Sequence, residues 1–268
     1  MAGQRPPRTP AEKKPAELAA PPRGRASQPG ETERRTRGGW VPVGTAAVRR
    51  AEQQSRSTGR GKRTRREIIA AARRVFERSG YFDASVEAIV TEAGVARGSF
   101  YTYFPSKLEV FQVIASEAIF EIMDSVGEGD DERAIDTHVK LARSNRRYLE
   151  AFKTNARIYT LVDQVGTMDP VVRDLYLRGR QFHIARVAST ITRWQERGMA
   201  YPSIDAKTTA AALVSMTSHF AHWLYVGGDD EYDEETAINT VTDIWIKATG
   251  LQAHPPAFPP VGEDDAGA

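Results

Sequence analysis

Apolar residues recur at helical spacing from residue 64 to residue 250, and no segment in between shows the strict alternation of a strand. In TRREIIAAARRVFERSG the apolar side chains lie three and four positions apart, Thr64 and Glu67 have the spacing of a capping box, and Gly80 ends the run. The pattern therefore predicts a first helix that begins at Thr64 and ends at Gly80.

Three further helices are predicted directly after the first. A short helix follows Ser85, a typical N-cap residue, and ends at Gly94. A second short helix covers 96–104, and Ser106 with Glu109 has the spacing of a capping box for a longer helix. Two short helices joined by a glycine-containing turn, with a further helix packed behind them, are typical of a helix-turn-helix.

The remainder of the chain predicts helices only. Amphipathic segments recur at residues 132–153, 155–165, 170–197, 205–226 and 233–250. The last three segments follow aspartates suited to N-caps, which are Asp169, Asp205 and Asp233. The sequence therefore predicts an all-α protein of about nine helices.

Charge is distributed unevenly along the chain. The first 62 residues carry 14 Lys and Arg against 5 Asp and Glu, whereas residues 108–268 carry 15 against 25. A basic front indicates a polyanionic partner at that end. The chain has no cysteine, which excludes disulfides, thiolate zinc sites and cysteine nucleophiles. Because it shows neither an apolar stretch of roughly 20 residues nor the apolar core of a signal peptide, we expect a cytoplasmic protein.

The segment ARGSFYTYF has two different faces when it is folded as a helix. Phe100 and Phe104 share a face that can pack inside the protein. The opposite face holds Arg97, Gly98, Tyr101 and Thr102. Arg97 can donate two hydrogen bonds to a guanine, the Thr102 methyl group can contact a thymine, and Gly98 permits close approach of the backbone. This face is suited to the major groove of DNA.

Neighbouring residues are suited to phosphate oxygens, through hydroxyl groups, positive charge or a position at a helix start. They are Ser99, Tyr101 and Tyr103, Lys107 in the first turn of the following helix, and Thr64, Arg65, Arg66 and Ser85 at the starts of the first two helices. Each has a simpler alternative, since surface arginines are commonly only solvated and Tyr103 can belong to the core.

The segment AGVARGSFYTYFPSK resembles the DNA-binding domain of TetR-family transcriptional regulators. In that family an aromatic pair precedes a Phe and a following Lys, which matches Tyr101, Tyr103, Phe104 and Lys107, and a Thr or Ser after the turn matches Ser99. The resemblance extends from the first predicted helix to Lys107. It implies an all-helical homodimer on a palindromic operator, with a variable C-terminal domain whose small-molecule ligand releases the DNA.

We therefore expect four parts in the chain. They are a disordered basic arm at 1–60, a helix-turn-helix DNA-binding domain at 61–107, a helical ligand-binding and dimerisation domain at 108–251, and a disordered tail at 252–268. The arm is a departure from the family, whose members commonly begin close to the first helix. An arm that binds DNA should steepen the salt dependence of binding.

The last two predicted helices carry small side chains that permit close approach of a second helix: Ala211, Ala212, Val214, Ser215, Ser218 and Ala221. The resemblance assigns these helices to the dimer interface, as a four-helix bundle. The alternative is that the small residues pack within one chain.

The middle helices hold more aromatic and methionine side chains than a simple bundle needs, which is typical of a mostly apolar pocket. The candidates for ligand contact are Phe120, Met123, Phe152, Tyr159 and Phe182, with His183 or Arg186 available to orient a polar or anionic group. For each of them, an ordinary place in the core is the alternative.

No catalytic or metal-binding constellation accompanies these features. His219 and His222 lie three apart, but no carboxylate at a supporting spacing completes a metal site. We expect no cofactor and no enzymatic activity, since phosphate-cradling glycine motifs and triad patterns are missing from the sequence. The favoured function is a DNA-binding repressor that a small, largely apolar ligand releases. The alternative is a constitutive or architectural nucleic-acid-binding protein driven by the basic arm.

Overall fold

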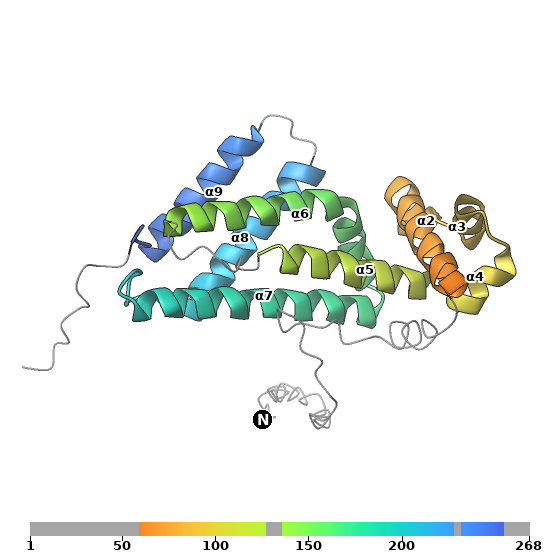
Figure 1. The fold of residues 1–268 in the computed structure, drawn as a ribbon, viewed down its shortest axis with the longest axis horizontal. Helices are drawn as coiled ribbons and strands as arrows, with labels where there is room; N and C mark the ends of the chain where they lie inside the picture. The colour runs from red at the N-terminus through yellow and green to blue at the C-terminus, as the bar shows by residue number, and fades with distance from the viewer. Residues whose placement is uncertain (1–58, 127–135, 228–231, 255–268) are drawn as a thin grey trace, which may run out of the picture. The chain divides into compact units, whose positions relative to one another are not determined.

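The computed structural model describes residues 59–126, 136–227 and 232–254, and the regular structure of these ranges is entirely helical (Figure 1). The helices are α2 Gly59–Asp83, α3 Val86–Ala93, α4 Arg97–Tyr103, α5 Lys107–Asp124, α6 Thr137–Gly166, α7 Pro170–Glu196, α8 Ala206–Val226 and α9 Glu234–Thr249. The all-α prediction is thereby confirmed for the described residues. Nearly all of the predicted arm and tail lies outside them.

The start of the first helix was predicted wrongly. Helix α2 begins at Gly59, so Thr64 lies inside the helix, and Glu67 pairs with Arg63 at 2.8 Å (Arg Nε to Glu Oε1) instead of closing a capping box. Lysine and arginine are good helix formers, and a pair four residues apart supports the helix through the basic stretch. The predicted break at Gly80 is confirmed as a kink within α2, because the φ of Gly80 is 77° and lies outside the helical range.

The segments predicted at 132–153 and 155–165 form one helix, α6, rather than two. The junction holds Thr154 and Asn155, whose side chains donate to the carbonyls of Glu150 and Ala151, one turn earlier in the same helix. Neither glycine nor proline interrupts the chain there, so polar residues alone did not end the helix.

Five of the predicted helix starts are confirmed by their caps, whereas α6 begins at Thr137 and not at 132. At each of the five, a side-chain oxygen accepts a hydrogen bond from a backbone N–H in the first turn of the helix. The capping residues are Ser85 of α3, Ser106 of α5, Asp169 of α7, Asp205 of α8 and Asp233 of α9, with donor–acceptor distances from 2.7 to 3.2 Å. These local signals are confirmed.

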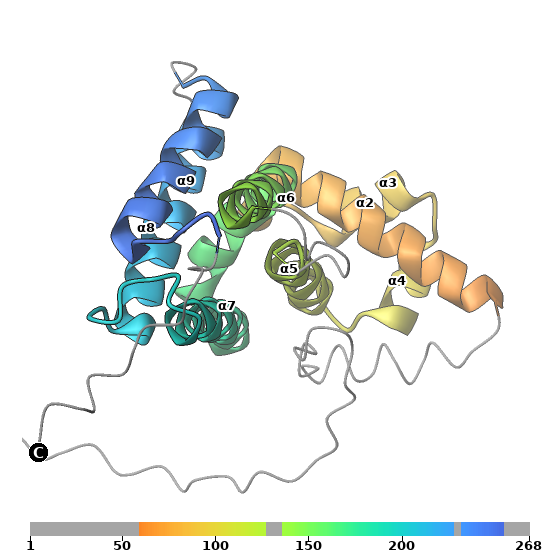
Figure 2. The same cartoon turned by 60° about the vertical axis from the view of Figure 1, so that its left-hand side comes forward.

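Helices α5, α6 and α7 contact one another and are seen close to end-on in Figure 2, with α8 and α9 side by side against them. Helix α2 packs on α3 and also on α5 and α6. One core cluster extends from Phe76 and Phe100 through Phe111 to Phe152, while Leu213 and Trp245 belong to a second cluster. The three N-terminal helices therefore share a continuous core with the middle of the protein. None of the described helices is long and apolar enough to span a membrane.

Candidate nucleic-acid interface

Helices α3 and α4 form a helix-turn-helix. Gly94 ends α3 with a φ of 65°, and its N–H donates to Thr91 O while the N–H of Val95 donates to Val90 O at 3.1 Å. A left-handed residue at this position favours glycine, because a side chain there would clash with its own backbone. After two further residues α4 begins, with Ala96 as its N-cap. The turn thus fixes the direction in which α4 leaves α3.

Helix α4 has the two faces that the sequence predicts. Phe100 and Phe104 are buried against the core of the three-helix unit. The opposite face is exposed along the whole helix and consists of Arg97, Gly98, Tyr101 and Thr102. In a helix-turn-helix this is the face of the second helix that enters the major groove.

Arg97 is held on this face by two neighbours. Its guanidinium forms an ion pair with Glu87 of α3 and lies 5.7 Å from the centroid of the Tyr101 ring. A hydrogen bond to the Tyr101 hydroxyl, reinforced by the charge of Glu87, raises the pKa of Arg97. The side chains of Arg97 and Glu87 are 61% and 59% exposed, so water screens the pair and another hydrogen-bond acceptor can displace the carboxylate.

Gly98 faces away from every other part of the described structure. A Cβ added at this position would meet no atom within 4 Å. Packing inside the chain therefore does not require glycine here, and the helical backbone does not require it either. A small residue at this position is suited to close approach of a surface outside the chain, such as the wall of a DNA groove.

Two of the hydroxyl residues form hydrogen bonds with the backbone of the chain. Ser85 accepts a hydrogen bond from Ala88 N as the N-cap of α3, and the Thr102 hydroxyl donates to the Gly98 carbonyl at 3.1 Å. Tyr103 is half-buried and packs on the core, as its alternative assignment allowed. Tyr101 is 45% exposed, which leaves it the more accessible tyrosine of the pair.

The structure gives Lys107 a role that the sequence did not indicate. Its Nζ donates to the carbonyls of Tyr81, Phe82 and Ala84 at 2.7, 3.3 and 2.7 Å, and lies 4.6 Å from the Tyr81 ring centroid. An ammonium group has three donors, so all of them are directed at the α2–α3 connection. Burial lowers the pKa of Lys107. In this arrangement Lys107 fixes the entry to α3.

Arg65 and Thr64 also differ from their predicted surroundings, because α2 begins before them. The Arg65 guanidinium lies 5.4 Å from the centroid of the Phe104 ring, and its buried Nε has no hydrogen-bond partner among the described residues. Burial lowers the pKa of Arg65, while the charge of Glu117 on α5 opposes this shift. The side chain of Arg65 therefore extends from α2 toward Phe104 and α5.

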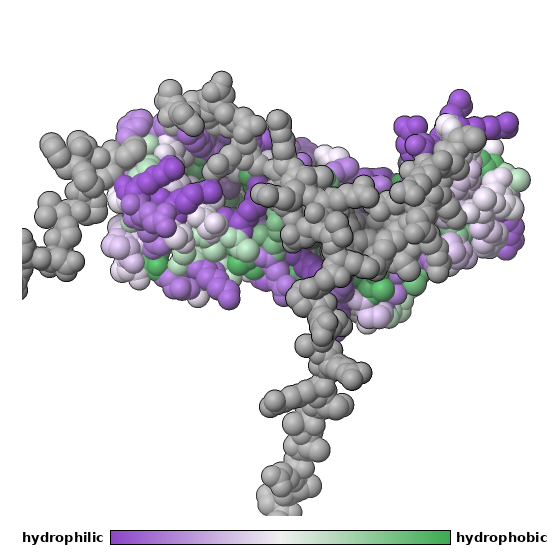
Figure 3. All heavy atoms as spheres, turned by 60° about the horizontal axis from the view of Figure 1, so that its bottom comes forward, coloured by the Kyte–Doolittle hydropathy of each residue, from purple (hydrophilic) through white to green (hydrophobic). Residues whose placement is uncertain are grey.

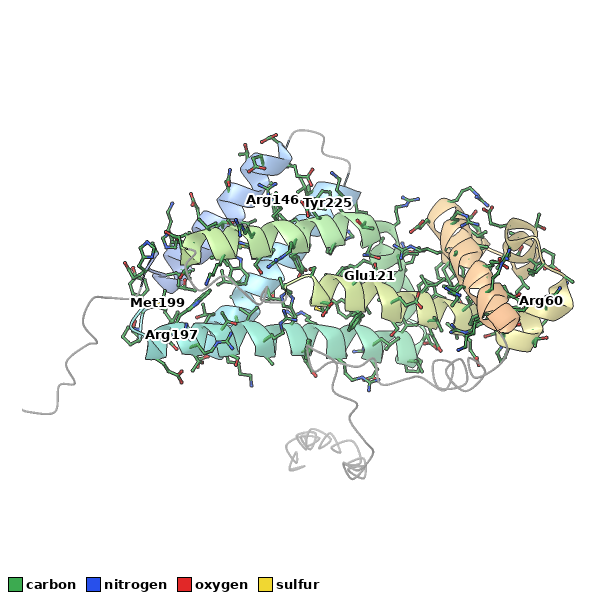
Figure 4. The ribbon with its side chains drawn as sticks, in the orientation of Figure 1. Arg60, Glu121, Arg146, Arg197, Met199 and Tyr225 are labelled. Carbon is green, nitrogen blue, oxygen red and sulfur yellow. The ribbon has the colours of Figure 1, made fainter. Side chains whose placement is uncertain are left out.

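Exposed positive charge is instead carried by the first two turns of α2. Arg60, Lys62 and Arg66 are exposed there, and Arg60 is seen at the start of the helix in Figure 4. Figure 3 shows hydrophilic side chains at the right-hand end of the described structure, the end that holds α2, α3 and α4 in Figure 1. Arg60 and Lys62 were not among the predicted contacts, because the expected helix start at Thr64 left them outside the first helix. Their basic sequence GRGK was the available signal.

A row of five rings runs through the middle helices, and it contains three of the predicted ligand contacts. The rings belong to Tyr176, Tyr159, Phe152, Tyr148 and His183, and their consecutive centroids lie 5.8, 4.9, 6.3 and 5.3 Å apart. Tyr176 and Tyr159 are half-buried, whereas the other three are buried. We call these five residues the ring row.

The remaining ligand candidates lie beside the ring row or apart from it. Arg186 of α7 donates to the carbonyl of Met123 at the end of α5 at 3.1 Å. Phe120 and Phe182 are half-buried. Tyr148, Tyr176 and Ser218 were missed as candidates. For Tyr148, the available signal was its spacing with Phe152 and Tyr159 on one face of α6, which a search for separate aromatic residues does not detect.

Comparison with known proteins identifies relatives for both parts of the structure. Residues 68–114 match the family described as "Bacterial regulatory proteins, tetR family", and residues 141–249 match "Transcriptional regulator EthR, C-terminal domain". The chain is 31% identical to the HTH-type transcriptional repressor BepR of Brucella suis, over 66% of this chain and 88% of the relative. It is 26% identical to the HTH-type transcriptional regulator EthR of Mycolicibacterium smegmatis, over 71% and 92%.

Among solved structures, the fold is similar to a putative TetR-family transcriptional regulator from Mesorhizobium loti. The TM-score is 0.58 at 20% sequence identity, over 71% of this chain and 96% of that chain. At this identity the likeness concerns the fold, which is an N-terminal helix-turn-helix unit followed by a helical domain.

Proposed function

The chain belongs to the TetR family of bacterial regulatory proteins, and on that basis we propose that it is a repressor that binds a palindromic operator as a homodimer and is released by a small molecule. As in its relatives, the helix-turn-helix makes it a DNA-binding transcriptional regulator. We assign DNA binding to 61–107 and ligand binding with dimerisation to 108–251, divisions that the two family matches support.

The observation that carries the DNA-binding assignment is the exposed face of α4. It presents a guanidinium, a phenol and a threonine around a glycine that no packing inside the chain requires. Arg97 and Thr102 are suited to base edges, whereas Tyr101, Ser99 and the exposed cations of α2 are suited to phosphates. Lys107 and Arg65 have roles inside the protein in this assignment.

Replacing Gly98 by leucine tests the assignment directly. A Cβ at this position meets nothing within 4 Å beyond its own helix, and leucine favours a helix over glycine by roughly 0.8 kcal/mol, so the free energy of unfolding should stay the same or rise. On DNA the added bulk lies between α4 and the groove, and we expect affinity for operator DNA to fall at least 100-fold. Fluorescence anisotropy with a labelled duplex measures the loss.

The matched control is Ala185→Leu, which adds similar bulk at an exposed position of α7. This variant should bind DNA like the original protein. If Gly98→Leu binds operator DNA as tightly as the original protein, this face of α4 does not contact the DNA.

The proposed dimer is formed by α8 and α9. Ala212, His219 and Trp223 are spaced along one face of α8 and are accessible, with Trp223 52% exposed, and Ile244 of α9 is 40% exposed. Val214 and Ala221, two of the small residues of α8, are buried within the chain instead. We expect light scattering to give twice the chain mass of 29.7 kDa for the full-length protein, and a lower mass for Trp223→Asp.

Release is proposed to follow from a ligand among α5, α6 and α7. Helix α2 packs on both α5 and α6, so a change in the separation of these helices reaches the DNA-binding unit. For a complete switch, the ligand must bind the released conformation about 5.5 kcal/mol more tightly than the DNA-binding one. A ligand that binds tightly and leaves operator affinity unchanged would contradict this mechanism.

A further inference from the structure

The ring row leads from a half-buried end to a buried end. Its two end residues, Tyr176 and His183, are seven residues apart on α7, which is a rise of about 10 Å along that helix. Tyr176 and Tyr159 mark its accessible end, and His183, which is 5% exposed, marks its inner end. The rise between the two end residues is similar to the length of two linked six-membered rings.

The inner end holds a polar atom without a partner. His183 Nδ1 is buried and makes no hydrogen bond within the described part of the chain. Buried polar atoms in folded proteins are normally hydrogen-bonded, because an unmet donor or acceptor has lost its water without compensation. A group from outside the chain can supply the missing partner.

Two further polar groups lie beside this histidine. The Tyr148 ring is 5.3 Å from the His183 ring, and the Tyr148 hydroxyl forms a 2.8 Å hydrogen bond with Ser218 Oγ of α8. Helices α6, α7 and α8 thus bring a phenol, an imidazole and an alcohol together at the inner end of the ring row. A few convergent polar groups in a largely apolar lining are typical of small-molecule sites.

The imidazole and the phenol at this end are both neutral at pH 7. Burial, helped by the nearby Arg186, lowers the pKa of His183 to about 4, so the imidazole is neutral at pH 7. Burial raises the pKa of Tyr148 to about 12 and also raises that of Tyr159. Arg186 is engaged with the carbonyl of Met123. An ionic group on a ligand would lose its hydration next to a neutral ring, and the nearest compensating charge is Arg186, which already donates to a backbone carbonyl.

We propose that the effector of this protein is an uncharged molecule with a flat, aromatic-sized body along the ring row and a hydroxyl or amide group that hydrogen-bonds His183 Nδ1. The assignment rests on the proposed function, because it gives a chemical class to the effector proposed there. It replaces the anionic group that the sequence left open for His183 and Arg186.

Three matched probes test the proposal on the full-length protein without DNA: biphenyl, 4-phenylphenol and biphenyl-4-carboxylate. They share one body and differ in carrying no polar group, a neutral hydroxyl or a charge. By calorimetry at pH 7.5, we expect 4-phenylphenol to bind about fivefold more tightly than biphenyl. We expect the carboxylate to bind at least 100-fold more weakly than 4-phenylphenol.

In His183→Leu, the preference for 4-phenylphenol over biphenyl should fall to within about twofold, because leucine keeps the bulk and removes the polar atom. His254→Leu, an exposed histidine near the end of the described chain, is the control and should retain the preference. If His183→Leu does not fold, the ranking of the three probes on the original protein still decides the matter.

The proposal is overturned if the carboxylate binds as tightly as the phenol, if His183→Leu keeps the preference, or if none of the three probes binds up to its solubility. These outcomes are separate from failure of the proposed function. Binding of 4-phenylphenol through His183 with unchanged operator affinity would refute release while the ligand class stood. A protein that selects an operator but binds none of the probes would refute the ligand class alone.

Discussion

Arg73 of α2 and Asn155 of α6 lie 82 residues apart in the chain, and Arg73 Nη2 donates to Asn155 Oδ1 at 2.8 Å. Asn155 is 1% exposed, and its amide also donates to Glu121 of α5, labelled in Figure 4, at 3.1 Å. On α6, Asn155 stands between Phe152 and Tyr159 of the ring row, three residues after one and four before the other. One face of α6 therefore carries both the proposed effector contacts and the connection to the DNA-binding unit.

Loss of this connection should destabilise the protein. We expect Asn155→Ala to lower the free energy of unfolding by about 2 to 3 kcal/mol, because it removes the hydrogen bonds that join a buried amide to the charged groups of Arg73 and Glu121. A double-mutant cycle with Arg73→Ala, measured by urea unfolding, should give a coupling of about 1 kcal/mol. Arg74→Ala is the control, since Arg74 pairs with Glu92 of α3 and should be additive with Asn155→Ala. Additivity in both cycles would show that Arg73 and Asn155 are not linked energetically.

Arg97 should determine the preference at one base pair. We expect Arg97→Ala to weaken operator binding by about 1 to 3 kcal/mol and to relax the preference at a single position, because a bidentate contact to guanine is lost. Binding to a panel of single-base variants of the operator measures both effects. Arg178→Ala, at an ion-paired position of α7, should change neither. An equal loss on every sequence would make Arg97 a phosphate contact.

Replacing Lys107 should change the stability of the protein, whereas replacing Arg66 should change the salt dependence of DNA binding. Lys107→Met leaves three carbonyls without their donor, so we expect a loss of about 1 to 3 kcal/mol in the free energy of unfolding and an unchanged slope of log K against log salt. Arg66→Gln, at an exposed position, should lower the slope by about one and change stability by less than about 0.5 kcal/mol. If Lys107→Met keeps its stability and shows a reduced slope, Lys107 contacts a DNA phosphate after all.

His183 should make the protein less stable in mild acid. Its pKa is lowered to about 4 in the folded state, below its ordinary value, so between pH 6.5 and 4 the unfolded chain binds a proton that the folded protein does not. The stability linked to this group is complete above pH 6.5 and declines as the pH falls. From pH 6.5 to 5 the free energy of unfolding should fall by about 1.5 kcal/mol more than in His183→Leu. Urea unfolding at each pH measures the difference, and parallel curves for the two proteins would contradict it.

The predictions from sequence succeeded where the signal is local. Helix caps depend on residues three positions apart, and the inward and outward faces of α4 follow from the spacing of Phe100 and Phe104, so both were found. The start of α2 was missed because a Thr–Glu spacing looked like a cap, although the basic residues before it continue the helix. The unity of α6 was missed because Thr154 and Asn155 bond to their own helix.

Roles that depend on distant parts of the chain could not be predicted in this way. The acceptors of Lys107 lie 23 to 26 residues earlier, and only the packing of α5 against the α2–α3 connection brings them to its ammonium group. The contact between the Phe104 ring and Arg65 likewise joins residues that lie far apart in the sequence. The missing hydrogen-bond partner of His183 Nδ1 depends on how α6, α7 and α8 pack together, and the spacing of residues within α7 does not indicate it.

Sequence-specific binding to DNA is the central claim, and selection from random duplexes tests it most directly. The purified full-length protein is incubated with a pool of random duplex DNA at near-physiological salt, and the enriched sequences are determined. We predict a palindrome, with half-sites about one helical turn or more apart, and its loss in the Gly98→Leu variant. Enrichment without any consensus would contradict the account and favour a constitutive or architectural DNA-binding protein.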